Sequence, residues 1–241
     1  MPSEQTNARI IVVGGHTRNI GKTQLVCDII AALPEANWIA GKITQYGHGV
    51  CARNGHDCHC APDEHVCALD WERDANSGTD SARFLAAGAR RSFWLRTKQG
   101  FLAEGMPLLR SALDEFGNSV EARHAVPSFS PPPIHVILES NSLLQFLKPD
   151  LFLMVLHPGK SDFKDSAQLQ LDRASAFVLR DPIVSDENGE MAAISWRNNP
   201  IQFLRSKPNF LQRETDPLPV SLLELIRGSA CNDHQTPSIN K

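Results

Sequence analysis

The residues best suited to chemistry lie in one short segment that follows a run of apolar residues. Residues 14–23 read GGHTRNIGKT, and a helix-forming stretch begins at their end. Glycine lets backbone N–H groups converge on phosphate oxygens, and a helix N-terminus adds a favourable partial charge. In such loops the lysine reaches the β- and γ-phosphates, and the hydroxyl after it can bind Mg²⁺. The segment is therefore predicted to bind the phosphates of ATP or GTP together with Mg²⁺.

The predicted nucleotide contacts come from this loop and the first turn of the helix after it. They are Gly15, Asn19, Ile20, Gly21, Lys22, Thr23 and Gln24, with Lys22 also acting in catalysis and Thr23 also binding Mg²⁺. The pattern departs from Gly-x-x-x-x-Gly-Lys-Ser/Thr at one position, because His16 stands where the first glycine is expected. The alternative is a chance Gly-Lys-Thr that only begins a helix, and the strand before it and the amphipathic helix after it disfavour this alternative.

A phosphate loop of this kind needs an acid for the Mg²⁺ or its water. Glu139 directly follows the apolar residues 134–138, a predicted strand. Parallel strands bring their C-terminal ends to the side where the phosphate loop lies, so Glu139 is the first candidate for Mg²⁺ binding and catalysis. Asp80 and Asp74 are the second candidates for this acid, and Asp80 is also predicted to be catalytic. The alternatives are that Glu139 caps a helix starting near Asn141, and that both aspartates are ordinary loop or helix-start acids.

Four of the six cysteines crowd into one polar stretch, at Cys51, Cys58, Cys60 and Cys67. Four thiolates suit tetrahedral Zn²⁺ and could also hold an iron–sulfur cluster. Four interleaved histidines could replace one thiolate: His48, His56, His59 and His65. Residues 44–78 lack a sustained period, and a loop this polar can hardly be ordered by burial alone. We therefore predict a metal-binding insertion, with Zn²⁺ preferred, and free thiols with solvated histidines as the alternative.

The composition limits the class of protein. The 241 residues suffice for one large α/β domain, and the formal net charge of −3 argues against a broad basic surface for nucleic acid. No apolar run approaches the ~20 residues needed to cross a bilayer. The polar start lacks the apolar core of a signal peptide. We therefore expect a cytoplasmic protein with neither a nucleic-acid nor a membrane partner.

Apolar runs alternate with helical periodicities, which predicts a doubly wound, mainly parallel sheet of the P-loop NTPase type. Strands are expected at residues 10–13, 38–43, 92–96, 134–138, 150–156 and 176–179, with an edge strand at 191–196. Helices are expected at residues 23–33, 80–89, 100–116 (interrupted at 105–107), 143–147, 163–172 and 218–226. The prediction is one domain over residues 1–228, with residues 44–78 inserted after the second strand and a disordered tail at 229–241.

Four motifs together resemble the molybdopterin-guanine dinucleotide biosynthesis protein B family of P-loop NTPases. They are the phosphate loop, the strand at 39–44 (IAGKIT), the stretch from Asp74 through 77–83 (SGTDSAR) to 87–89 (AGA), and the strand at 136–139 (VILE). The resemblance covers residues 9–156 and implies an accessory NTPase in cofactor assembly with slow hydrolysis, an assembly protein as partner and a homodimeric state. His16, Ser140 in place of a glycine after Glu139, and the four-cysteine loop depart from the family pattern.

Several questions stay open at the level of sequence. A guanine-reading Asn-Lys-x-Asp is absent, so the sequence does not decide between ATP and GTP. A small-molecule kinase on the same fold would use Asp74 or Asp80 to activate an acceptor hydroxyl. A non-enzymatic metal-binding interaction module with a decayed phosphate loop is the third function, and His16 is the residue that favours it. Lys42 and Arg18 are interpreted either as phosphate contacts or as solvated side chains.

Overall fold

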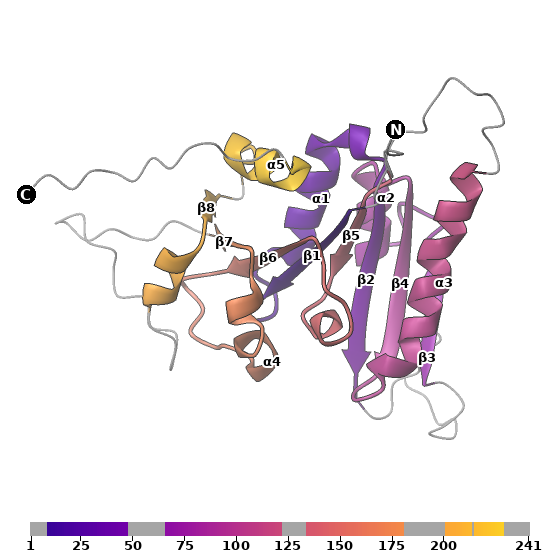
Figure 1. Ribbon diagram of the computed structural model, residues 1–241, viewed down its shortest axis with the longest axis horizontal. Coiled ribbons are helices and arrows are strands. Elements are labelled where there is room, and N and C mark those ends of the chain that lie inside the picture. The colour runs from indigo at the N-terminus through magenta and orange to yellow at the C-terminus, as the bar shows by residue number, and fades with distance from the viewer. Residues whose placement is uncertain (1–8, 48–65, 122–133, 181–200, 214, 229–241) are drawn as a thin grey trace, which may run out of the picture.

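A computed structural model describes residues 9–47, 66–121, 134–180, 201–213 and 215–228. One eight-stranded sheet has the order β3-β4-β2-β5-β1-β6-β7-β8, and every neighbouring pair is parallel except β3 with β4 (Figure 1). The strands are β1 Ile10–Gly15, β2 Ile39–Tyr46, β3 Cys67–Trp71, β4 Arg91–Lys98, β5 Val136–Glu139, β6 Leu151–Leu156, β7 Ala176–Arg180 and β8 Asn209–Gln212. This confirms the predicted doubly wound α/β fold.

Helices cover both faces of the sheet because side chains alternate along each buried strand. Ile11 and Val13 of β1 belong to the core beneath α1, α2 and α5, whereas Val12 belongs to the core beneath α3. The helices are α1 Lys22–Ala32, α2 Asp80–Ala86, α3 Leu102–Glu121, α4 Asp165–Gln168 and α5 Val220–Arg227, with 3₁₀ turns η1 Pro34–Ala36, η2 Ser142–Gln145, η3 Leu171–Arg173 and η4 Ile201–Ser206.

The region predicted as an insertion without regular structure contains parts of the sheet. β2 continues to Tyr46, and β3 pairs antiparallel with β4 at the sheet edge. The sequence signal of β3 is weak because its residues are only half-buried or exposed, so no apolar run marks it. Residues 48–65 of the predicted insertion lie outside the described residues.

Helix α3 is continuous, so the predicted interruption at residues 105–107 is wrong. A Cβ on Gly105 would lie 2.8 Å from Thr97 Cγ2, which shows that this glycine allows close approach of the helix to β4. Met106 and Leu109 are buried on the same face, and their packing outweighs the hydrogen bond lost at Pro107. Strand β8 was not predicted, because only one of its four residues is buried. The edge strand predicted at 191–196 and the tail at 229–241 lie outside the described residues.

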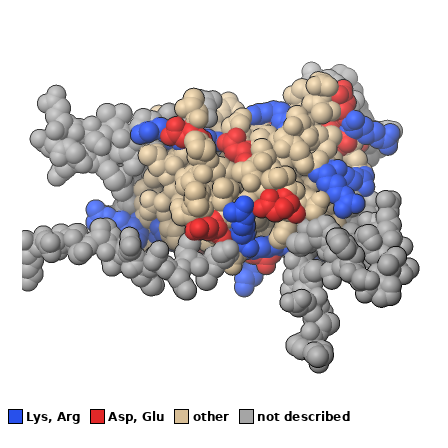
Figure 2. Space-filling model, turned by 90° about the horizontal axis from the view of Figure 1, so that it is seen from above, with Lys and Arg blue, Asp and Glu red and all other residues tan. Residues whose placement is uncertain are grey.

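The charges on the surface do not form a single-sign field on the face seen in Figure 2, where acidic and basic side chains are scattered among uncharged ones. This agrees with the formal net charge of −3. In the described part of the chain, the helices are all too short or too polar to cross a bilayer.

Candidate functional site

The loop between β1 and α1 is shaped by two residues with positive φ. Asn19 has φ 52° and Gly21 has φ 82°. Asparagine tolerates this left-handed region, and glycine enters it without penalty. At Gly21 an added Cβ would also lie 2.9 Å from Arg180 Nε. No described side chain caps the start of α1, and its first turn holds no acid, so the N–H groups of this turn remain available to an anion.

His16, where the sequence pattern expects glycine, does not obstruct the loop. Its side chain is fully buried, its Nε2 lies 3.2 Å from Lys160 O, and its ring lies 5.1 Å from that of Phe163. Burial lowers the pKa of His16, although a backbone hydrogen bond with Lys160 opposes this. The imidazole packs against the segment after β6, so His16 gives no support for a decayed phosphate loop.

Three residues that sequence reasoning did not assign hold the loop in place. Asn141 accepts a hydrogen bond from Gly15 N at 2.8 Å and donates one to Gly15 O at 2.7 Å. Lys160 donates to Asn19 O at 2.7 Å, and Arg180 donates to Gly21 O at 3.1 Å. Each of the three stands at the C-terminal end of a strand or in the connection that follows it. Their position after β5 and β6 and at the end of β7 is the signal that could have identified them.

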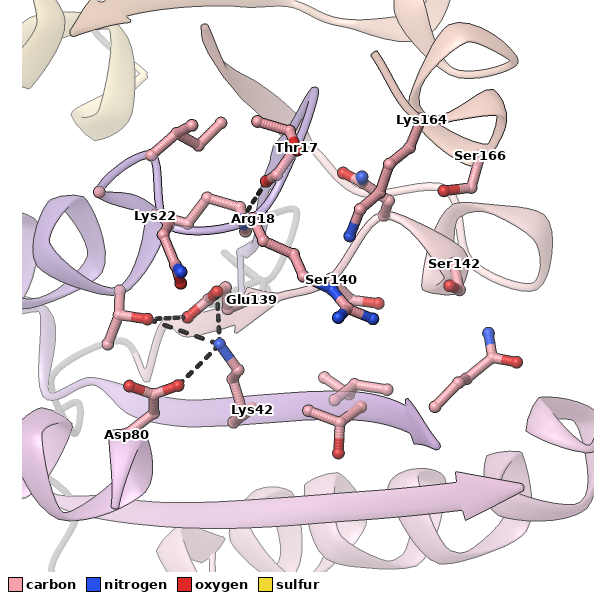
Figure 3. A pocket seen from close by; sticks show the side chains of 18 of the residues that line it. Thr17, Arg18, Lys22, Lys42, Asp80, Glu139, Ser140, Ser142, Lys164 and Ser166 are labelled. Carbon is pink, nitrogen blue, oxygen red and sulfur yellow. Dashed lines mark hydrogen bonds and ion pairs between the residues drawn. The ribbon is translucent and has the colours of Figure 1, made fainter. Parts of the chain in front are cut away.

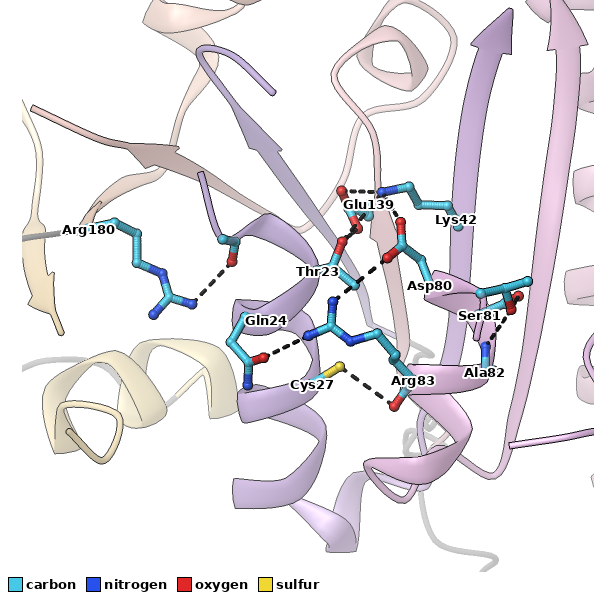
Figure 4. A network of polar contacts seen from close by, with 12 residues as sticks. Thr23, Gln24, Cys27, Lys42, Asp80, Ser81, Ala82, Arg83, Glu139 and Arg180 are labelled. Atoms are coloured by element: carbon cyan, nitrogen blue, oxygen red, sulfur yellow. Dashed lines mark hydrogen bonds and ion pairs between the residues drawn. The ribbon is translucent and has the colours of Figure 1, made fainter. Parts of the chain in front are cut away.

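Four side chains from separate segments meet at the start of α1 (Figures 3 and 4). The Thr23 hydroxyl donates to Glu139 Oε2 at 2.7 Å. The Lys42 ammonium lies 2.5 Å from Glu139 Oε1, 2.8 Å from Asp80 Oδ2 and 3.5 Å from Thr23 Oγ1. β5 is the direct neighbour of β1, so Glu139 lies where parallel order predicts, and it contacts Thr23 rather than capping a helix.

Lys22 lies next to this cluster, with its ammonium donating to Thr17 O at 2.8 Å. Burial lowers the pKa of Lys22 to about 8, the nearby Glu139 raises it, and Lys42 lowers it. The ammonium is therefore in a site that disfavours its charge until an anion enters.

A second network positions Asp80 at the start of α2. Thr79 caps this helix by accepting from Ala82 N at 3.0 Å, and the Thr79 hydroxyl donates to Glu72 Oε2 at 2.7 Å. Burial opposes ionisation of Glu72, but hydrogen bonds from Thr79 and other donors bring its pKa to about 2. Asp74 lies in the exposed turn before α2 and does not line the pocket described next, unlike Asp80.

Helix α2 also contacts the first turn of α1. Arg83 donates to Gln24 Oε1 at 2.7 Å, and Gln24 Nε2 donates to Asp28 Oδ1 at 2.7 Å (Figure 4). Gln24, predicted to contact nucleotide, is thus fixed by protein groups on both sides. In the same contact, the thiol of Cys27 donates to Arg83 O at 3.6 Å. Burial raises the pKa of this thiol to about 11, which keeps it protonated and unreactive.

A cavity of about 730 Å³ opens over these groups. Polar and charged residues from the C-terminal side of the sheet dominate its lining (Figure 3). The lining includes Arg18, Asn19, Ile20, Gly21, Lys22, Thr23, Gln24, Lys42, Asp80, Arg83, Glu139, Asn141, Ser142, Lys164 and Ser166. Every predicted nucleotide contact except Gly15 lines it. Gly15 lies beneath the loop, where an added Cβ would lie 2.7 Å from Ile20 Cδ1.

The predicted cysteine site falls mostly outside the described residues. Cys51, Cys58 and Cys60 lie outside them, and Cys67 begins β3 with its thiol donating to Glu104 O at 3.4 Å. Burial and the charge of Glu104 raise the pKa of the Cys67 thiol. Within the described ranges, no group of three or more metal-binding side chains is present. The metal centre therefore stays a prediction.

Comparison with known proteins shows a likeness to a solved structure. No protein-family model matches the chain. No curated protein matches it either. Among solved structures, the crystal structure of HypB from Helicobacter pylori in complex with nickel is similar over 92% of this chain and 85% of that chain, with 12% sequence identity and a TM-score of 0.46. At this identity no residue of the site is assigned from it, and the family resemblance drawn from the motifs stays a prediction.

Proposed function

We propose that this protein binds a nucleoside triphosphate, ATP or GTP, with Mg²⁺ and hydrolyses it slowly. The observation that carries the proposal is the hydrogen bond from Thr23 to Glu139 at the start of α1. No described side chain caps this helix, and the loop before it contains two residues with positive φ. A hydroxyl and a carboxylate meet at the helix N-terminus, next to a lysine whose site disfavours its charge. This combination suits a polyanion with a bound cation.

The residues present fit Mg²⁺. Thr23 Oγ1, Glu139 and Asp80 supply only oxygen atoms, and all three surround the Lys42 ammonium at 3.5 Å or less. Mg²⁺ prefers oxygen ligands from one or two carboxylates together with phosphates and water. When bound, it would neutralise charge developing on the phosphates. Thr23 and Glu139 would hold it, with Asp80 in contact directly or through water.

The chain's own groups would act mainly by positioning. The N–H groups of the loop and of the α1 start would hold the β- and γ-phosphates, and Lys22 would turn from Thr17 O toward them. Lys42 holds the two carboxylates in place before the ligand arrives. Glu139 or Asp80 would orient the attacking water. Phosphoryl transfer depends chiefly on such positioning and charge stabilisation.

We propose further that this NTPase serves metal-cofactor assembly of the molybdopterin type, as an accessory to another assembly protein. The support is the convergence of the resembling motifs. Lys42 from the 39–44 motif, Asp80 from the 77–83 motif and Glu139 from the 136–139 motif are far apart in sequence but meet in one cluster. A homodimer and a cytoplasmic location belong to the same proposal.

The cysteine loop is proposed to bind Zn²⁺, with an iron–sulfur cluster as the alternative, within a single domain over residues 1–228. The proposal rests on the four closely spaced cysteines. Metal analysis of the purified protein tests it: one zinc per chain is expected, and its loss in Cys58→Ser/Cys60→Ser. A metal-free wild-type protein prepared without chelators would contradict it.

A small-molecule kinase is the second candidate, and one observation favours it. Asp80 lines the cavity with a side chain that is 38% exposed, so it can reach a second ligand as well as Lys42. Product analysis separates the two functions. A kinase transfers the γ-phosphate to an added metabolite, whereas an accessory NTPase releases only inorganic phosphate.

Calorimetric titration with Mg·ATP and Mg·GTP tests the central proposal. We expect saturable binding of at least one nucleotide and its loss in Lys22→Ala, with the variant still folded by circular dichroism. Lys148→Ala serves as the matched control, because Lys148 is exposed and does not line the cavity. Wild-type protein that binds neither nucleotide would refute the proposal.

A further inference from the structure

The cavity has two ends with different charge balance. At one end, Lys42 is paired with both lining acids, Glu139 and Asp80. Lys164 lies on the opposite side of the cavity from Lys42 and Asp80, and the Arg18 side chain extends into the middle of the cavity toward that side (Figure 3). Among the described residues, neither the Arg18 guanidinium nor the Lys164 ammonium has an ion pair or a side-chain hydrogen bond. Asp162 is the acid that acts on the Lys164 charge, and it does so without forming an ion pair with it.

Two hydroxyl groups belong to the same end of the cavity. Ser142 lies in η2, just after β5, and Ser166 lies in α4, after β6. Figure 3 shows both on the same side of the cavity as Lys164. Within the described chain, neither hydroxyl has a hydrogen-bond partner. Two cations and two hydroxyl donors, contributed by three separate segments, thus face one space.

A triphosphate does not use up the positive charge of the cavity. Five basic and two acidic side chains line it. A fully ionised triphosphate with one Mg²⁺ brings only about two negative charges, so the loaded cavity keeps a positive balance. Burial, followed by the charge of Arg18, lowers the pKa of Lys164, and the nearby Asp162 carboxylate opposes this only in part.

We propose that Arg18, Lys164, Ser142 and Ser166 form a subsite for a second, anionic ligand beside the γ-phosphate. The ligand is a small molecule bearing a phosphate or carboxylate group, because guanidinium, ammonium and hydroxyl donors match such oxygens. This ligand would be the acceptor or client on which the nucleotide acts. The inference rests on the proposed function in one respect: the triphosphate is taken to fill the end of the cavity that holds Lys22 and Lys42.

The test is a titration of two probes, inorganic phosphate and succinate, into protein saturated with Mg²⁺ and a non-hydrolysable triphosphate analogue. We expect saturable binding of at least one probe. Lys164→Met and Arg18→Met should each weaken it about tenfold or more, the value of one charge-assisted hydrogen bond. Lys148→Met, which removes an exposed charge elsewhere, should leave it unchanged. Thermal unfolding checks that each variant is folded.

Two results would overturn the inference. One is loaded protein that binds neither probe. The other is a Lys164→Met variant that binds them as tightly as the wild type. If Arg18 and Lys164 contact only the γ-phosphate, both variants will instead weaken triphosphate binding more than diphosphate binding, and no second anion will bind. That outcome refutes the subsite but leaves nucleotide binding intact, whereas failure of the analogue to bind refutes the proposed function first.

Discussion

The depressed pKa of Lys22 predicts how nucleotide affinity depends on pH. In the empty site this pKa is about 8. A bound triphosphate favours the ammonium and returns the pKa to its ordinary value of about 10.4 or above. Binding must therefore take up a proton wherever the free lysine is neutral. Below pH 8 the free lysine is already charged and affinity is flat; above pH 8 affinity falls as pH rises.

The size of this effect follows from the two pKa values. Between pH 7.5 and 9.5 the dissociation constant should rise about 20-fold, which is about 1.8 kcal/mol. Proton uptake should be about half a proton at pH 8 and about 0.9 at pH 9. The second pKa of a phosphate lies near 6, so the ligand does not titrate in this range.

Calorimetry in buffers of different ionisation enthalpy measures both the affinity and the proton uptake. Lys22→Arg is the control, because its guanidinium keeps its charge across the range and should give a flat profile. A flat wild-type profile, or a Lys22→Arg profile that falls as steeply, would refute the reasoning.

Three further predictions concern the groups around the phosphate loop. Lys42→Met leaves two carboxylates and the Thr23 hydroxyl without their cation. In the absence of nucleotide, the variant should therefore bind Mn²⁺ at least about tenfold more tightly than the wild type. Electron paramagnetic resonance measures this binding, and equal binding by wild type and variant would contradict the prediction. Glu72→Gln should destabilise the protein by about 1 kcal/mol at pH 7, a value reduced for the exposure of this carboxylate. Because the folded pKa of Glu72 is lowered to about 2, this stabilisation is full above the ordinary pKa of 4.5 and is lost as pH falls toward 2; urea unfolding that shows the same difference at pH 7 and pH 3 would count against it. Asn141→Ala removes both hydrogen bonds to Gly15 and should cost about 1–3 kcal/mol of stability; faster hydrogen exchange at Gly15 is expected, and unchanged exchange would show that the loop does not depend on this amide.

The sequence by itself determined the features whose residues are adjacent in the chain. It also determined those whose positions follow from the order of parallel strands in the sheet. Gly21, Lys22 and Thr23 follow one another, and a strand before them and a helix after them leave little freedom in where their groups point. Glu139 could be placed because it ends a strand next to β1, and the ends of parallel strands meet at one edge of the sheet. The four-cysteine metal site, by contrast, stays a prediction.

Only the tertiary structure decided which distant side chains meet. The sequence did not show that Lys42 lies between Glu139 and Asp80, that Asn141 holds both backbone groups of Gly15, or that the His16 ring packs against Phe163. These contacts join segments far apart in the sequence, and the two residues of the contact between Gly15 and Asn141 are 126 positions apart. Local propensity sets the backbone of each segment, but the direction of a side chain at a strand end depends on what the neighbouring strands and connections place around it.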